Sequence, residues 1–132
     1  MTPAGIQRWQ GDPPSPFEVT YSYSRVVSAG GWVLIGGTTS VDPSGVVLGE
    51  TPYEQTLEIL RKIEHELDRA GVALADLVQT RMYVVDITRG DEVAKAHAEV
   101  LGEVRPVTAM VEIGGLFDPR MYVEIEAAAF VG

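Results

Sequence analysis

The 132 residues of the chain, 45% of them hydrophobic, suffice for one hydrophobic core but hardly for two, so we expect a single soluble domain over residues 1–132. No apolar run approaches the roughly 20 residues of a membrane helix or resembles the core of a signal peptide, so we expect no membrane partner and a cytoplasmic location. The formal net charge of −9 opposes binding to nucleic acid, and the absence of cysteine excludes disulfides, thiolate metal sites and a cysteine nucleophile.

The first part of the chain predicts an edge strand followed by a hairpin. Residues 1–19 are rich in proline and polar groups, with a short strand at Ile6–Trp9. Aromatic and β-branched residues alternate with serines over residues 20–27, and a second apolar run over 32–35 follows Gly30 and Gly31. This arrangement predicts two antiparallel strands joined by a glycine turn.

Thr51 marks the start of the first long helix. Its side chain can cap the helix, Pro52 suits the first helical position, and Glu54 completes a capping box. Apolar residues then recur at mostly helical spacing, and Gly71 can take the left-handed conformation that ends a helix. We therefore expect a helix between Pro52 and Gly71 with one buried side.

The second half of the chain alternates strands with one more helix. A strand is expected over 77–85, and a helix follows in which apolar residues and His97 share a face, until Pro106 forbids its continuation. Two further strands are expected near 107–113 and 121–131. The order β-β-α-β-α-β predicts an α+β fold in which one mixed sheet carries two helices on one face.

Alternation along the last strand separates its two faces. One row is expected under the helices and comprises Val123, Ile125, Ala127, Ala129 and Val131. The other row comprises Tyr122, Glu124, Glu126 and Phe130, and we expect Glu112 of the preceding strand on the same face. An open face with aromatic residues fits packing against other copies of the chain, with a polar cleft where subunits meet. The alternative is a solvated acidic face.

Several local strings from about Tyr21 to the C-terminus form a pattern together. They are Tyr23-Ser24-Arg25-Val26-Val27-Ser28-Ala29-Gly30, Leu34-Ile35-Gly36-Gly37 leading to Val41-Asp42-Pro43, Arg105-Pro106 through Val111-Glu112-Ile113, and Val123-Glu124-Ile125-Glu126-Ala127. With the order of elements, they resemble the RidA family, also known as YjgF, reactive intermediate deaminase A or endoribonuclease L-PSP-like. The resemblance implies a chorismate-mutase-like fold assembled as a homotrimer. It also implies clefts between subunits, in which active members hydrolyse imines and enamines to ketoacids and ammonia without cofactor or metal.

The resemblance implies roles for individual residues. In active members an arginine on the strand after the second helix holds the substrate carboxylate, and a glutamate on the last strand positions the attacking water. The match implies that Glu124 is this glutamate and that Thr108 stands where the arginine would be, so the chain resembles a divergent member that lacks it. The implied substrate-binding positions are Tyr23, Gly36, Gly37, Thr38, Met110 and His97, of which Met110 contributes a backbone N–H.

Thr108 offers a hydroxyl but no charge, so it cannot neutralise a carboxylate, and the substrate is expected to differ from an imino acid. Arg105 could lean toward the cleft, and the other candidates from a neighbouring subunit are Arg25, Arg81 and Arg120. For most of these residues the alternative is that they have no role in the cleft. Arginines are usually solvated surface residues, and a histidine such as His97 is more often a core or interface residue.

Two functions remain compatible with these residues. The first is a hydrolase of a small imine, enamine or related metabolite that uses Glu124 and Thr108. The second is a protein that binds a small metabolite in the same cleft without converting it. Ribonuclease activity ranks last, because it predicts a basic groove or a stacking platform. No metal site is expected, because the two histidines lie on separate helices without the spacing of metal ligands.

Overall fold

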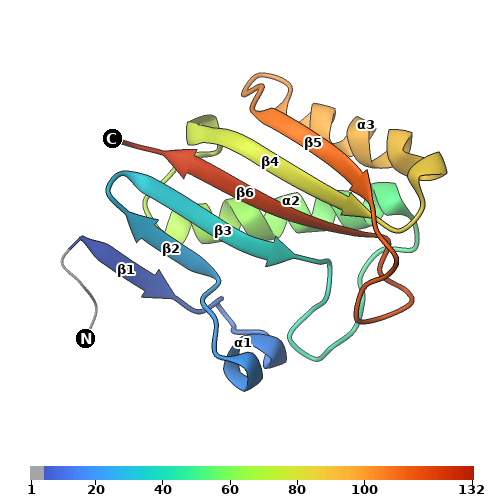
Figure 1. The fold of residues 1–132 in the computed structure, drawn as a ribbon, viewed down its shortest axis with the longest axis horizontal. Helices are drawn as coiled ribbons and strands as arrows, with labels where there is room; N and C mark the ends of the chain where they lie inside the picture. The colour runs from blue at the N-terminus through green and yellow to red at the C-terminus, as the bar shows by residue number, and fades with distance from the viewer. Residues whose placement is uncertain (1–4) are drawn as a thin grey trace.

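The computed structural model describes residues 5–132 and shows a mixed six-stranded sheet with two long helices on one face (Figure 1). The strands are β1 Ile6–Trp9, β2 Val26–Ala29, β3 Trp32–Thr38, β4 Leu77–Val84, β5 Val107–Glu112 and β6 Val123–Phe130. Their order in the sheet is β1-β2-β3-β6-β4-β5, and only β4 and β5 run parallel. The helices are α1 Pro16–Tyr21, α2 Pro52–Arg69 and α3 Gly90–Leu101, with short 3-10 turns at Leu74–Asp76 and Ile87–Arg89. The predicted α+β fold is confirmed, with β1 and α1 preceding the predicted series.

Helix α2 begins where the sequence predicts, and its cap explains why. The Thr51 hydroxyl accepts a hydrogen bond from the Glu54 backbone N–H and donates one to the Glu54 carboxylate, both at 3.1 Å. The Glu54 side chain therefore binds the hydroxyl rather than the Thr51 backbone N–H that a full capping box uses. The buried side of α2 packs on the sheet through Ile59, Leu60, Ile63 and Leu67. Within residues 5–132, no helix combines the length and the apolar character needed to cross a membrane.

The strand predicted over residues 20–27 is wrong in its first part. The chain forms helix α1 there, because Ser15 caps it: its hydroxyl accepts from the Glu18 N–H, and the Glu18 carboxylate accepts from the Ser15 N–H. Ser22 then takes a left-handed conformation, with φ 59°, and β2 starts only at Val26. A reciprocal cap thus overrides the alternating pattern of side chains.

The hairpin and the edge strand are both confirmed. Strands β2 and β3 pair antiparallel across Gly30 and Gly31, whose φ angles of 56° and 90° suit glycine. Strand β1 pairs with the outer side of β2 and forms one edge of the sheet.

Strand β6 lies in the centre of the sheet and divides its two faces as predicted. Its buried row comprises Val123, Ile125, Ala127 and Ala129, whereas Val131 lies beyond the strand and is half exposed, contrary to expectation. Glu124 and Glu126 pair with Tyr83 and Arg81 of β4 on the open face.

Strand β5 presents its faces the other way from the prediction. Thr108 and Met110 pair with Thr80 and Met82, which are buried under the helices, so Glu112 also points to the helix side. The prediction that Glu112 shares a face with Glu124 is therefore wrong. The parallel register with β4 decides this parity, and alternation within one strand cannot reveal it.

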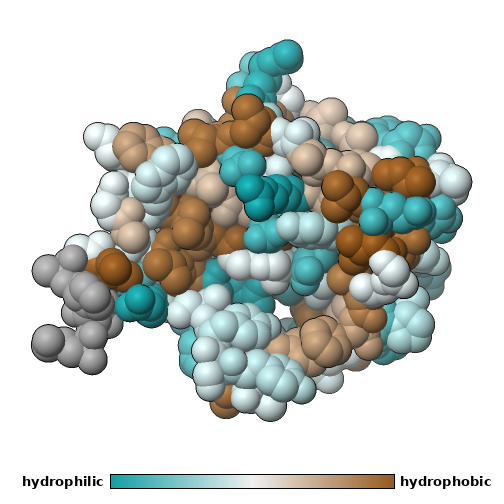
Figure 2. Space-filling view, in the orientation of Figure 1, coloured by the Kyte–Doolittle hydropathy of each residue, from teal (hydrophilic) through white to brown (hydrophobic). Residues whose placement is uncertain are grey.

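The open face of the sheet exposes large apolar side chains. Trp32, Leu34, Val111 and Phe130 are each 44–47% exposed, and the rings of Trp32 and Phe130 meet edge to face, with centroids 5.0 Å apart. Figure 2 shows apolar patches on this side of the molecule, divided by hydrophilic side chains. A face of this kind is typical of an interface between proteins.

Candidate functional site

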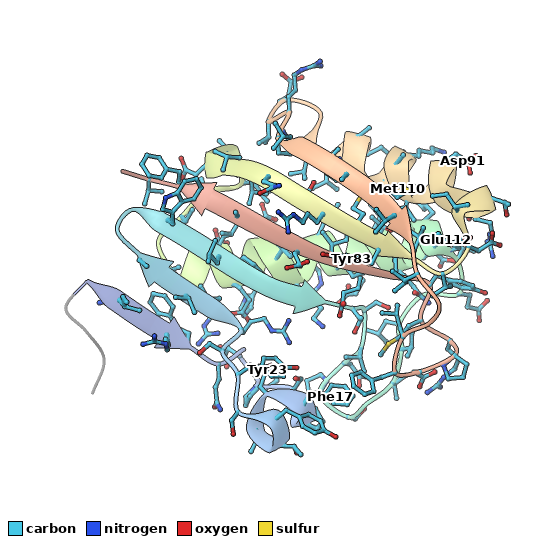
Figure 3. All side chains as sticks on the ribbon, in the orientation of Figure 1. Phe17, Tyr23, Tyr83, Asp91, Met110 and Glu112 are labelled. Carbon is cyan, nitrogen blue, oxygen red and sulfur yellow. The ribbon has the colours of Figure 1, made fainter. Side chains whose placement is uncertain are left out.

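A cavity of about 70 Å³ lies beside the ends of β3 and β6, next to α1. Its lining includes three residues that the resemblance implied, Tyr23, Gly37 and Glu124. Phe17 and Phe117 add an aromatic wall, with ring centroids 5.2 Å apart, and Figure 3 shows Tyr23 and Phe17 together at this end of the molecule. We refer to this space as the Glu124 cavity.

Glu124 is a half-buried carboxyl group next to a bulge in β3. The pairing of β3 with β6 shifts register between Ile35 and Thr38, which brings Gly36 and Gly37 out of the regular ladder and lays Gly37 against the Glu124 carboxyl. Burial raises the pKa of Glu124, the negative charge of Glu126 raises it further, and Arg25 opposes both effects. A carboxylate with a raised pKa is a stronger proton acceptor at neutral pH.

Arg25 is a buried cation that fixes the bulge. Its guanidinium donates to the Gly37 carbonyl at 2.7 Å, to the Thr38 hydroxyl at 3.2 Å and to Glu18 at 3.3 Å, and Thr38 in turn donates to the Gly36 carbonyl. Arg25 is 8% exposed and Glu18 is 1% exposed. Arg25 was a candidate contributor from a neighbouring subunit, but it lines the Glu124 cavity of its own chain.

Glu18 is ionised despite its burial. Burial raises its pKa, but hydrogen bonds from the Gly11 and Ser15 N–H groups and the charge of Arg25 outweigh this effect and lower the pKa. No motif pointed to Glu18 as a buried ion. The serine-to-glutamate spacing at Ser15 and Glu18 could have revealed the cap but not the ion pair.

Lys62 reaches from α2 into the same region. Its ammonium group donates to the Thr39 carbonyl at 2.6 Å and to the Val41 carbonyl at 2.9 Å. Burial, followed by the charge of Arg25, lowers the pKa of Lys62 to about 8. Lys62 lines the Glu124 cavity, and no sequence motif marks it.

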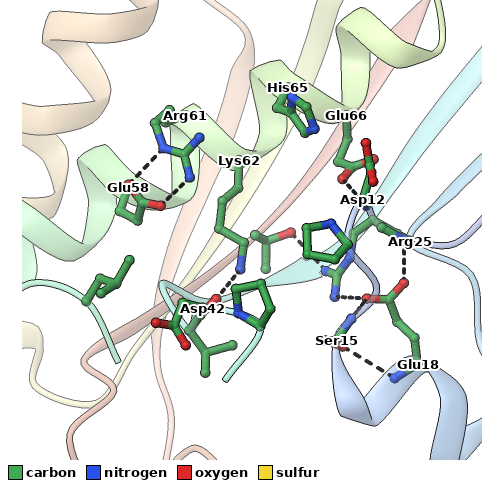
Figure 4. Close-up of a pocket in the computed structure, with 16 residues that line it drawn as sticks. Asp12, Ser15, Glu18, Arg25, Asp42, Glu58, Arg61, Lys62, His65 and Glu66 are labelled. Carbon is green, nitrogen blue, oxygen red and sulfur yellow. Dashed lines mark hydrogen bonds and ion pairs between the residues drawn. The ribbon is translucent and has the colours of Figure 1, made fainter. Parts of the chain in front are cut away.

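A larger cavity of about 320 Å³ adjoins the Glu124 cavity and shares Arg25 and Lys62 with it. Figure 4 shows Lys62 extending from α2 toward the segment that carries Asp42. Arg25 and Glu18 lie to the right of Lys62 in this view. The carboxylates in this larger cavity outnumber its cations, because Asp12, Glu18, Asp42, Glu58 and Glu66 line it together with Arg25, Arg61 and Lys62. The smaller cavity therefore suits an anion better.

Thr108 and His97 lie elsewhere in the chain, on the helix side of the sheet. The buried Thr80 hydroxyl donates to Thr108 at 2.8 Å and forms a hydrogen bond of 2.8 Å with Nε2 of His97. Burial lowers the pKa of His97, which favours its neutral form. Figure 3 shows Met110 beside α3, far from Tyr23. One chain does not bring these residues to Glu124, so any contribution from them requires a second copy.

The other candidate arginines are outside the Glu124 cavity. Arg105 lies exposed in the turn after α3, with φ 55°, and Arg120 forms an exposed ion pair with Asp118. Arg81 faces the open side of the sheet, opposite Glu126. Among residues 5–132, no three His, Asp or Glu side chains are grouped so that they could hold a metal ion.

Comparisons with known proteins agree with this architecture. The family model described as Endoribonuclease L-PSP matches residues 14–131. The chain is similar to the uncharacterised protein SCO2049 of Streptomyces coelicolor, with 32% identity over 133 residues that cover 100% of this chain and 97% of its relative. It is also similar to the RutC family protein PH0854 of Pyrococcus horikoshii, with 31% identity over 82% of this chain and 86% of the relative.

A solved structure shares the fold as well. Rv2704 of Mycobacterium tuberculosis, described as a member of the YjgF/YER057c/UK114 family, is 43% identical, with a TM-score of 0.85 over 96% of this chain and 99% of its own. The match extends from α1 to the end of β6 and thus includes the segments that carry Tyr23, Gly37 and Glu124. The chain belongs to the Endoribonuclease L-PSP family, that is, the YjgF or RidA family.

Proposed function

We propose that this protein hydrolyses a small reactive imine or enamine at Glu124. The observation that carries the proposal is the half-buried Glu124 carboxyl, with its raised pKa, in a cavity that also contains Tyr23 and Gly37. Family membership supports the same reaction class, although one fold can host different functions. Tyr23 walls the cavity, and backbone groups at the β3 bulge orient the substrate.

The proposed reaction uses one water molecule. Glu124 accepts a proton from the water while the water oxygen bonds to the imine carbon. The C=N electron pair moves to nitrogen. Glu124 returns the proton to that nitrogen. Glu124 next carries the hydroxyl proton to the amino nitrogen, and the C–N bond breaks. Ammonia leaves with that proton, and the hydroxyl oxygen becomes the carbonyl oxygen. An enamine enters the same sequence after its carbon is protonated to give the imine.

We further propose a homotrimer whose subunits pack through the open face of the sheet. Exposed apolar residues such as Leu34 and Phe130 support this assembly. Thr108, Met110, His97 and Arg105 lie away from Glu124 in one chain, so in the trimer they would reach a cleft only from a neighbouring subunit. A small metabolite is the expected partner.

Hydrolysis of 2-iminopropionate generated in situ tests the proposal. Lys62 brings to the cavity a cation that Thr108 does not provide, so an imino acid is a suitable substrate despite the expectation from Thr108. The natural protein should release pyruvate and ammonia faster than the uncatalysed reaction, and Glu124→Gln should abolish this acceleration while the protein stays folded. An equal rate in the natural protein and Glu124→Gln would exclude Glu124 as the base. In parallel, Thr108→Arg adds the cation that active relatives are expected to use.

Binding without turnover is the second candidate. The observation that favours it is Thr108, which carries no charge and whose hydroxyl is engaged by Thr80. Inactivity of the natural protein that Thr108→Arg rescues would indicate a cleft suited to another substrate. Inactivity of both would favour binding alone. Cleavage of RNA, which the family description names, ranks last because the chain carries a net charge of −9.

A further inference from the structure

Lys62 is a cation without a counter-charge. The neighbouring cations are neutralised, Arg25 by Glu18 and Arg61 by Glu58, but within residues 5–132 no carboxylate forms an ion pair with Lys62. Two of its three N–H groups donate to neutral backbone carbonyls, and the third has no acceptor in the described part of the chain. A charge withdrawn from water without a partner is costly, so this ammonium group is suited to an anion.

The ammonium group of Lys62 lies at the wall of the Glu124 cavity. The two carbonyls that hold it belong to Thr39 and Val41, and both residues line that cavity along with Lys62 itself. The lining contains Arg25, whose charge Glu18 neutralises, and Lys62, which has no carboxylate partner among residues 5–132, beside the carboxyl of Glu124. In a chain with a net charge of −9, Lys62 thus brings to this cavity a cation that is available to an anion.

We infer that Lys62 binds the carboxylate of a small anionic substrate in the Glu124 cavity and thereby supplies the charge that Thr108 cannot. The inference rests on the proposed function and adds to it the residue of this chain that binds the carboxylate of an imino-acid substrate. Lys62 acts as a point charge with one free N–H, so it recognises a carboxylate without the bidentate geometry of an arginine.

A purely structural role for Lys62 makes a different prediction. Its bonds to Thr39 and Val41 tie α2 to the segment after β3, and loss of this tie would affect every ligand of the cavity to a similar degree. Loss of a carboxylate-binding charge affects anions only. The contrast between pyruvate and its neutral counterpart pyruvamide, which have the same shape, therefore separates the two roles.

The experiment measures binding of pyruvate and pyruvamide to the natural protein, Lys62→Met, Lys62→Arg and Lys95→Met by isothermal titration at pH 7. Lys95 is the second lysine of the chain and is exposed on α3, so Lys95→Met is the matched control. We expect Lys62→Met to weaken pyruvate binding at least tenfold and to leave pyruvamide binding unchanged. Lys62→Arg should recover part of the loss. Equal pyruvate binding by the natural protein and Lys62→Met, or no pyruvate binding by the natural protein, would overturn the inference.

A second measurement needs no variant and covers the case in which Lys62→Met does not fold. Because the pKa of Lys62 lies at about 8, the affinity of the natural protein for pyruvate should fall as the pH rises from 7 to 9.5, whereas the affinity for pyruvamide should not. An affinity for pyruvate that is constant over this range would contradict the inference.

These outcomes are distinct from failure of the proposed hydrolysis. If pyruvate binds through Lys62 but no imine is hydrolysed, the anion site stands and the hydrolase proposal fails. If imines are hydrolysed with the same KM by the natural protein and Lys62→Met, the hydrolase proposal stands and Lys62 has no role in substrate binding.

Discussion

Gly37 is the residue that leaves room for the Glu124 carboxyl. A Cβ atom at position 37 would lie 2.9 Å from Cδ of Glu124, closer than such atoms approach in folded proteins, and 3.0 Å from its Oε2. Both residues are on neighbouring strands, β3 and β6, and the bulge in β3 brings the backbone to this distance. The position of the proposed base thus depends on the absence of a side chain on the adjacent strand.

Gly37→Ala should displace the Glu124 carboxyl and slow imine hydrolysis on the order of 10–100-fold, because a shift of about 1 Å in a reacting group can cost that much. Steady-state kinetics with 2-iminopropionate would measure the effect. Gly114→Ala is the control, since no atom lies within 4 Å of a Cβ at that position. A Gly37→Ala protein with the natural rate would show that the close approach has no catalytic importance.

Burial and, after it, the negative charge of Glu126 raise the pKa of Glu124 and should shift the lower end of the pH range for activity upward. A base works only when ionised, so the rate falls as the pH drops through the pKa of Glu124. Glu126 raises that pKa, so Glu126→Gln should lower it and move the acidic limb of the kcat/KM profile to lower pH. Glu112→Gln, on the helix side of the sheet, should leave the limb in place. A Glu126→Gln limb at the natural position would argue against Glu124 as the titrating base.

The Arg25–Glu18 pair should be essential for stability. Arg25→Met leaves a carboxylate with 1% exposure without its cation, and breaking a buried pair from one side costs about 3–5 kcal/mol. Denaturant unfolding monitored by circular dichroism gives the free energy of unfolding. Arg120→Met, which removes an exposed pair with Asp118, should cost about 0–1 kcal/mol. Similar losses for the two variants would mean that the buried pair is dispensable.

The proposed trimer should dissociate when a charge is placed on the open face of the sheet. Leu34→Glu puts a carboxylate on this face. The molecular mass measured by sedimentation should therefore fall from about three times the subunit mass of 14.3 kDa to the mass of one subunit. Val46→Glu changes an equally exposed residue in the loop after β3 and should leave the mass unchanged. A natural protein that sediments as a monomer at micromolar concentration would rule out the trimer.

Local sequence signals predicted correctly those elements that are determined by contacts between residues close together in the chain. Thr51 and Glu54 fixed the start of α2, and the alternation after Val123 assigned both faces of β6 correctly. The cap at Ser15 and Glu18 was equally local, but the alternating residues that follow it favoured a strand and obscured α1.

Relationships between distant segments could not be predicted in this way. The face of Glu112 follows from the register of β5 against β4, which no single strand reveals. Lys62 lies among polar residues of α2, and only the fold brings it to the Thr39 carbonyl. Resemblance to a family supplied Glu124 and Tyr23, but it could not supply a cation at a position that carries no family motif.

The central position of β6 has a consequence for the synthesis of the protein. Strands β1–β3 and strands β4–β5 leave the ribosome first, and each group lacks the neighbour that β6 provides. The final strand therefore joins two halves of an unfinished sheet and brings the proposed catalytic carboxylate with it. Until that strand is inserted, the unpaired backbone N–H and C=O groups along β3 and β4 are open to pairing with other chains, so this interval is the one in which a nascent copy most needs protection from aggregation.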